Sequence, residues 1–131
     1  MLWFLRFIFI AVLGSMLWVT GWASLRVSVL AIPRDVLTHP WFIATLFDAY
    51  FGFLTFYVWQ AWKEQSLAAR VLWFVAVMLL GNLAMSIYLL VELFRIKEFA
   101  QLTDVISRRN PGRLALPGAL VAASIGIYLL T

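Results

Sequence analysis

The chain contains no cysteine and only one histidine, His39, among its 131 residues. Without a thiol it cannot form a disulfide, a cysteine nucleophile or a thiolate metal site, and one imidazole cannot build a histidine cluster. Charged residues are also scarce, at 12% of the chain. We therefore expect no metal site. No nucleophile lies beside a recognisable base, which argues against an enzyme without deciding the question.

Apolar residues dominate instead. They make up 65% of the chain, and the mean hydropathy is +0.97, whereas soluble domains contain about 45–50% apolar residues. This composition is typical of an integral membrane protein. The ten basic residues give a net charge of +4, but most lie at the edges of apolar runs, where they signal membrane topology and not nucleic-acid binding. We expect the lipid bilayer as a partner and no nucleic acid.

Four apolar runs approach the roughly 20 residues that a helix needs to cross a bilayer. They predict one all-α domain over residues 1–131, a membrane-embedded four-helix bundle with spans at about 2–24, 40–62, 71–94 and 114–131. The first run is longer than the apolar part of a signal peptide, so we expect it to be retained. Tryptophans near the run ends predict an aromatic belt.

The connections between the runs carry further signals. Thr38 or His39 can cap the second helix, and Pro40 suits its first turn. The short polar stretch 63–70 predicts an antiparallel pair of helices on either side of it. Between the third and fourth spans, apolar residues at helical spacing predict an amphipathic helix over 97–109, lying in the membrane interface. Basic residues there are expected to contact lipid head groups, namely Arg108, Arg109 and Arg113.

The distribution of basic residues predicts an orientation. Four crossings would put both termini and the 63–70 connection on one side, with three basic residues, and the other two connections on the opposite side, with seven. Because basic residues concentrate on the cytoplasmic side, we expect both termini outside the cytoplasm. The membrane would be a plasma membrane, or the inner membrane in a bacterium.

One acid interrupts the second run, "WFIATLFDAYFGFLTFYVW", at Asp48. A charge well inside the hydrocarbon costs roughly 2.5–3.5 kcal/mol and needs a partner, water or a proton. On a helix, Asp48 shares a stripe with small, polar and tryptophan residues, which predicts that this stripe faces the bundle interior. A depth estimate places Ser86 and Tyr88 of the third span level with Asp48, and Asn82 one turn away.

Two functions remain open on this evidence. The first is a non-enzymatic accessory or scaffold subunit that packs against other membrane subunits or against itself, with Asp48 in a structural hydrogen bond. The second is a binding or translocation site for a proton, a cation or an isoprenoid-like small molecule centred on Asp48. No cofactor is expected beyond a bound lipid or apolar ligand. The candidate ligand or proton site comprises Trp41, Thr45, Asp48, Trp59, Asn82, Ser86 and Tyr88.

Three motifs carry a resemblance to a known family. They are "LTHPWFIATLFDAY", "WQAWKE", and the spaced Trp73, Gly81 and Tyr88. Over residues 37 to about 94 the chain resembles a domain-of-unknown-function family of small polytopic membrane proteins from plants and bacteria. The positions that carry the resemblance are Leu37, Thr38, Trp41, Ala44, Thr45, Leu46, Asp48, Trp59, Lys63, Glu64, Trp73, Gly81 and Tyr88.

The chain also departs from that family's pattern. His39 is an extra residue, Asn82 replaces a serine, and Glu92 replaces a glutamine. The resemblance therefore implies a shared role for Asp48 more strongly than for Glu92, and it implies no activity.

Overall fold

The computed structural model describes residues 1–130, so Thr131, the last residue of the fourth predicted run, lies outside the described part. Within it the predicted all-α class is confirmed, and the only β-type pairing is an isolated bridge between Glu64 and Asn110. The elements in chain order are α1 (Leu2–Ser24), η1 (Val29–Ala31), α2 (Arg34–Leu37), α3 (Pro40–Lys63), α4 (Leu67–Leu80), α5 (Asn82–Arg95), η2 (Phe99–Gln101), α6 (Leu102–Ser107) and α7 (Ala115–Leu130).

Helices α1 and α3 are long and apolar enough to cross a membrane. They lie where the first two spans were predicted, and their 23 and 24 residues correspond to about 35 Å each. In the most apolar stretch of each helix, only 11% of the α1 residues and none of the α3 residues are buried. Their apolar side chains therefore face outward, unlike those of a core helix in a soluble protein.

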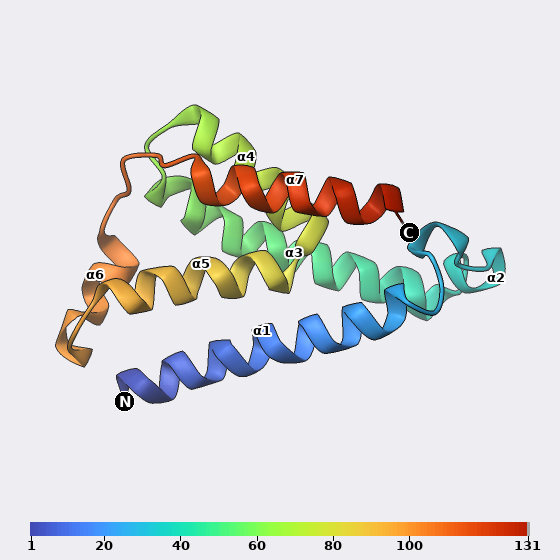
Figure 1. Ribbon diagram of the computed structural model, residues 1–131, viewed down its shortest axis with the longest axis horizontal. Helices are drawn as coiled ribbons and strands as arrows, with labels where there is room; N and C mark the ends of the chain where they lie inside the picture. The colour runs from blue at the N-terminus through green and yellow to red at the C-terminus, as the bar shows by residue number, and fades with distance from the viewer. Residues whose placement is uncertain (131) are drawn as a thin grey trace.

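The third predicted span, 71–94, is wrong as a single helix. The chain breaks at Gly81 into α4 and α5, which fold back on each other as a helical hairpin (Figure 1). The rings of Trp73 and Tyr88 lie 4.9 Å apart in an edge-to-face contact. Along one straight helix these residues would be about 22 Å apart. Both ends of the hairpin therefore lie at the same end of the molecule.

Gly81 makes this turn possible. Its φ of 56° and ψ of −121° form a backbone conformation open to glycine and strained for other residues. A Cβ atom at this position would also lie 2.6 Å from Cζ of Phe53, whose ring fills the turn from α3. The last carbonyls of α4 find donors on its neighbours, because the Tyr50 hydroxyl donates to Met78 O and the Tyr128 hydroxyl donates to Leu79 O.

The long helices pack around the hairpin. Helix α1 lies along α5, α7 lies along α4, and α3 is antiparallel to α4, as the short 63–70 connection predicted (Figure 1). Arg6 of α1 donates to the carbonyls of Leu93 and Ile96 at 3.0 and 2.7 Å, which satisfies the end of α5. Helix α1 begins at one end of the molecule and α7 ends at the other (Figure 1).

The buried face of α3 differs from the predicted one. Asp48, Gly52 and Thr55 are exposed, whereas Gln60 and Lys63 are fully buried. The stripe that packs inward is rotated by one residue, about 100°, from the predicted stripe. The reason is that aromatic rings, among them Phe53 and Phe56, fill the contact with the hairpin and displace the small residues from it.

Two smaller predictions on the connections can be compared with the structure. His39 does cap α3, because its Nδ1 accepts a hydrogen bond of 3.2 Å from the Trp41 amide, and Pro40 occupies the first turn. Over 97–109 the predicted single helix is replaced by η2 and the six-residue α6, which ends at Ser107. Val105 on α6 is buried, and it packs with Leu93 and Ile96 against the start of α1.

Candidate functional site

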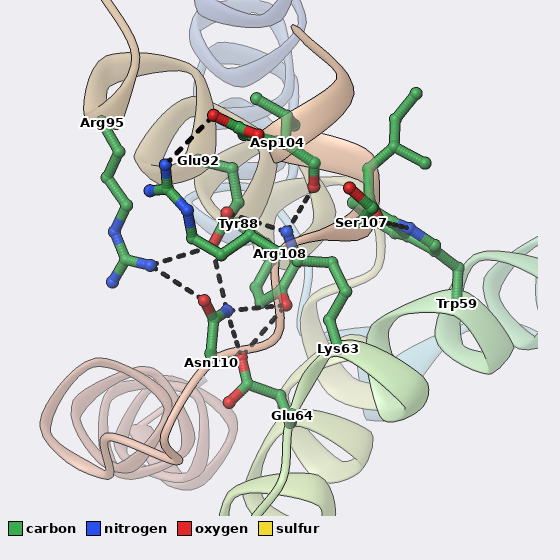
Figure 2. Close-up of polar contacts among 12 residues, drawn as sticks. Trp59, Lys63, Glu64, Tyr88, Glu92, Arg95, Asp104, Ser107, Arg108 and Asn110 are labelled. Atoms are coloured by element: carbon green, nitrogen blue, oxygen red, sulfur yellow. Dashed lines mark hydrogen bonds and ion pairs between the residues drawn. The ribbon is translucent and has the colours of Figure 1, made fainter. Parts of the chain in front are cut away.

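Six polar residues from three segments form a cluster at the base of the hairpin, called here the polar network, and all of them except Arg95 are buried. It contains a cation at its centre, Lys63, whose side chain is fully buried at the end of α3 (Figure 2). Its Nζ lies 2.8 Å from Oε2 of Glu92 on α5, donates to the carbonyl of Val105, and sits 5.2 Å from the ring centroid of Trp59. The members are Lys63, Glu64, Tyr88, Glu92, Arg95 and Asn110.

Asn110 connects the other members of the network. Its Nδ2 lies within 2.9–3.2 Å of Glu64 Oε1, Glu92 Oε1 and the Tyr88 hydroxyl (Figure 2). Its Oδ1 accepts a hydrogen bond of 2.9 Å from Arg95. Main-chain bonds reinforce these contacts, since the Asn110 amide donates to Lys63 O at 2.6 Å and its carbonyl accepts from Gln65 N at 3.1 Å. This residue therefore ties the segment after α6 to the end of α3.

Two carboxylates balance two cations inside the network. Glu92 accepts hydrogen bonds from Lys63, Asn110 and Arg95, the last at 3.3 Å, and Glu64 Oε1 accepts from Tyr88 at 3.0 Å. Both carboxylates are at most 3% exposed. Buried charges are tolerated only when they are paired and hydrogen-bonded in this way, so the network specifies how α3, α5 and the 105–110 segment meet.

Aromatic rings close the network on the side of the core. Tyr88 makes edge-to-face contacts with Trp73, Trp59 and Phe56 at centroid distances of 4.9, 5.9 and 6.1 Å. The indole of Trp59 also donates to Ile106 O at 2.9 Å. These rings hold the Tyr88 hydroxyl in place towards Glu64 and Asn110.

A cavity of about 250 Å³ lies beside the network. Its polar side is formed by network members together with Arg113, and its apolar side by residues of α4, α5 and the start of α7. A second, mostly apolar groove of about 880 Å³ lies at the other end, between the tip of the hairpin, α1 and α7. Asp48 lines neither of them. Within residues 1–130, no group of three acidic or histidine residues is arranged to hold a metal ion.

The structure does not bring the seven predicted site residues together. Tyr88 is a member of the polar network and Trp59 packs against it, whereas Ser86 is buried in the hairpin and Asn82 is exposed at its turn. Asp48 and Trp41 are exposed on the outer face of α3, and the Thr45 hydroxyl bonds to its own helix at Trp41 O. Tyr88 reaches Glu64, about 24 Å along α3 from Asp48, because the hairpin carries it back to the other end.

The residues predicted to contact head groups also have contacts within the chain. Arg108 lies 3.5 Å from Asp104, and both side chains are more than two-fifths exposed. Arg109 donates to Trp62 O at 3.0 Å and stacks over the Trp62 ring. Arg113 lines the cavity beside the network.

Sequence reasoning missed most of the network. Lys63 was counted with the basic residues that signal topology and among the motif positions, and neither Lys63 nor Asn110 was assigned to a site. Glu92 pairs with both Arg95 and Lys63, and its shorter bond, to Lys63, joins residues 29 positions apart that no local pattern links. The available signal was the set of motif positions, because Lys63, Glu64, Gly81 and Tyr88 all carry the family resemblance, and all lie in the network or the hairpin turn.

Of three comparisons with known proteins, the one with protein families finds a match. Searches among curated proteins and among solved structures each find no match. The family described as protein of unknown function (DUF1475) matches residues 2–110, which cover α1, α3, the hairpin and all six members of the polar network. This extends the resemblance seen over residues 37–94 to the first helix and to Asn110. The chain belongs to the DUF1475 family.

Proposed function

We propose that this protein is a multi-pass membrane protein that acts as a non-enzymatic accessory subunit, and that its α3 face binds a transmembrane helix of another protein. In this proposal α1, α3 and α7 cross the bilayer. The hairpin enters it from one side and returns, since α4 and α5 have 14 residues each, about 21 Å, against a hydrocarbon thickness of about 30 Å. The outward-facing apolar surfaces of α1 and α3 support this arrangement.

The fold suggests a different orientation from the one expected for a four-helix bundle. Eight basic residues lie at the end of the molecule that holds the base of the hairpin and the start of α1, and only Arg26 and Arg34 lie at the other end (Figure 1). The positive-inside rule then places the N-terminus, the base of the hairpin and the polar network on the cytoplasmic side. The eight residues are Arg6, Lys63, Arg70, Arg95, Lys97, Arg108, Arg109 and Arg113.

The observation that carries the accessory role is the position of Asp48. It lies near the middle of α3, is exposed, and stands next to Gly52, which has no neighbouring atom within 4 Å of its Cβ position. An acid facing lipid at this depth is costly, so the membrane form of the protein needs something to cover it. Small residues beside it let another helix approach closely.

Charge complementarity indicates the kind of partner. The ten basic residues of this chain all lie near the two ends of the molecule, so a second copy would present only another Asp48 at this depth. A helix with a lysine, arginine or histidine side chain at mid-span would pair with the carboxylate instead. We therefore assign the α3 face to a different protein with an intramembrane cation. A translocation site at Asp48 has less support, because neither the cavity beside the polar network nor the apolar groove includes this residue.

Photo-crosslinking in native membranes tests the proposal. A photoreactive residue at position 45 or 52, on the Asp48 face, should form a protein adduct, whereas the same residue at position 54, about 120° away on an exposed part of α3, should react mainly with lipid. Mass spectrometry of the adduct should identify a partner helix with a basic residue in its span. Asp48→Leu should reduce the adduct at least fivefold, and exchanging Asp48 and the partner's basic residue should restore it.

Thermal stability provides the control. Because Asp48 is exposed in the isolated chain, Asp48→Asn and Asp48→Leu should each change its unfolding free energy by less than about 0.5 kcal/mol. Adducts that contain only lipid at positions 45 and 52 would contradict the docking role of this face. An adduct with a second copy of the chain would replace the heteromeric partner by a homodimer and overturn the assignment above.

A further inference from the structure

The geometry points to a binding site for a zwitterionic group, an ammonium joined to a phosphate or carboxylate, in the cavity beside the polar network. The cavity has a volume of about 250 Å³, which can hold a polar head group. This inference does not depend on the partner proposed for α3.

The acidic side of the cavity is formed by Glu64, which is 3% exposed. Its Oε1 already accepts hydrogen bonds from Tyr88 and Asn110. Its Oε2 receives no hydrogen bond from any other residue within 1–130, and Figure 2 shows this second oxygen without a contact. An ammonium with three N–H donors would fit this acceptor.

The basic side is formed by two arginines at the mouth of the cavity. Arg95 uses NH1 for its contacts with Glu92 and Asn110, and its side chain is 29% exposed, so the rest of the guanidinium can donate outward. Arg113 lines the same cavity, is exposed, and forms no ion pair within residues 1–130. Guanidinium groups bind phosphate and carboxylate oxygens through paired hydrogen bonds.

The cavity is lined by both acidic and basic side chains, which favours a zwitterion over a simple ion as its ligand. A lone anion would face the carboxylates of Glu64 and Glu92, and a lone cation would face Arg95 and Arg113. A ligand with both charges satisfies both ends of the cavity. The opposite wall is apolar, with Trp73, Leu116 and Pro117, so it suits the uncharged linker that follows a head group.

Two sources supply this chemistry. One is the head group of phosphatidylethanolamine in the bilayer, and the other is a soluble zwitterion such as phosphoethanolamine. The purified full-length chain in detergent should be titrated with dihexanoyl phosphatidylethanolamine, dihexanoyl phosphatidylcholine and dihexanoyl phosphatidylglycerol, and separately with phosphoethanolamine. Binding can be followed by tryptophan fluorescence, because Trp73 lines the cavity.

We expect the ethanolamine lipid to bind at least tenfold more tightly than the other two lipids. The choline group has no N–H to donate to Glu64, and the glycerol group has no cation. Competition by phosphoethanolamine at similar concentration would identify a soluble ligand, and its failure to compete would identify the lipid; both results support the zwitterion site. Equal binding of the three lipids, without binding of phosphoethanolamine, would overturn it.

Variants keep the test independent of folding. Arg113→Gln, at an exposed position outside the polar network, should weaken binding of the ethanolamine lipid about tenfold through loss of one charge-assisted contact. Arg108→Gln removes the same charge from the same end of the molecule, away from the cavity, and should leave the affinity within twofold. Equal affinities of the two variants for the ethanolamine lipid would refute the assignment. Glu64→Gln is a secondary test, because Glu64 also supports the fold.

Discussion

Replacing Lys63 by methionine should destabilise the protein more than any other single loss of charge in the polar network. Lys63 is fully buried, and its Nζ contacts Glu92, the Val105 carbonyl and the Trp59 ring. Removing one member of a buried ion pair costs about 3–5 kcal/mol, because the other charge stays buried without its partner. Glu92 would keep Arg95 at 3.3 Å and Asn110 at 3.0 Å, so we expect the lower end, about 3 kcal/mol.

A double-mutant cycle separates the ion pair from the loss of packing. Glu92→Gln removes the matching charge while preserving the shape of the side chain, and in the Lys63→Met background it should restore about 1–2 kcal/mol. The unfolding free energy can be measured in detergent micelles by tryptophan fluorescence, since Trp59 touches the site. The control is Lys97→Met. Lys97 is the other lysine of the chain and is exposed, so its replacement should change the unfolding free energy by less than about 0.5 kcal/mol.

Two results would refute this reasoning. The first is a Lys63→Met protein as stable as the Lys97→Met control, which would mean that the buried ammonium contributes nothing. The second is strict additivity of Lys63→Met and Glu92→Gln, which would mean that the two charges do not interact despite their distance of 2.8 Å.

Two further predictions concern the hairpin. Gly81→Ala should lower the unfolding free energy by about 1–3 kcal/mol, because φ is 56° and the new Cβ would lie 2.6 Å from the Phe53 ring. Phe53→Leu in the same chain should restore part of that stability. A Gly81→Ala protein as stable as the parent would contradict the described turn. For topology, single cysteines can be placed in this cysteine-free chain at Leu30, Gln65 and Lys97. An impermeant thiol reagent should label intact cells only at position 30, and labelling of positions 65 and 97 from opposite sides would show that residues 71–94 cross the membrane.

The sequence predicted those features that depend on neighbouring residues. Uninterrupted apolar length located α1 and α3, and the His39-Pro40 pair located the start of α3. Each of these signals lies within one continuous stretch of the chain. Predictions from these signals therefore hold for any tertiary arrangement of the helices.

Features that depend on distant contacts were not predicted. Hydropathy is continuous across 71–94, and a glycine inside an apolar run is compatible with a straight helix, so Gly81 gave no decisive sign of a turn. Once the chain turns there, the depth estimate that placed Tyr88 beside Asp48 no longer applies. The rotation of α3 likewise depends on how the Phe53 ring fits against Gly81, a contact between different helices.

The long reach of Asn110 has a consequence for biogenesis. Asn110 bonds to the side chain of Glu64 and to the main chain of Lys63 and Gln65, although 46 residues separate Asn110 from Glu64. During synthesis from the N-terminus, Lys63, Glu64 and the whole hairpin are made before Asn110. The base of the hairpin is therefore completed only when residues 105–110 have been added. Chains truncated before Asn110 would therefore carry a nearly complete set of helices with an open base.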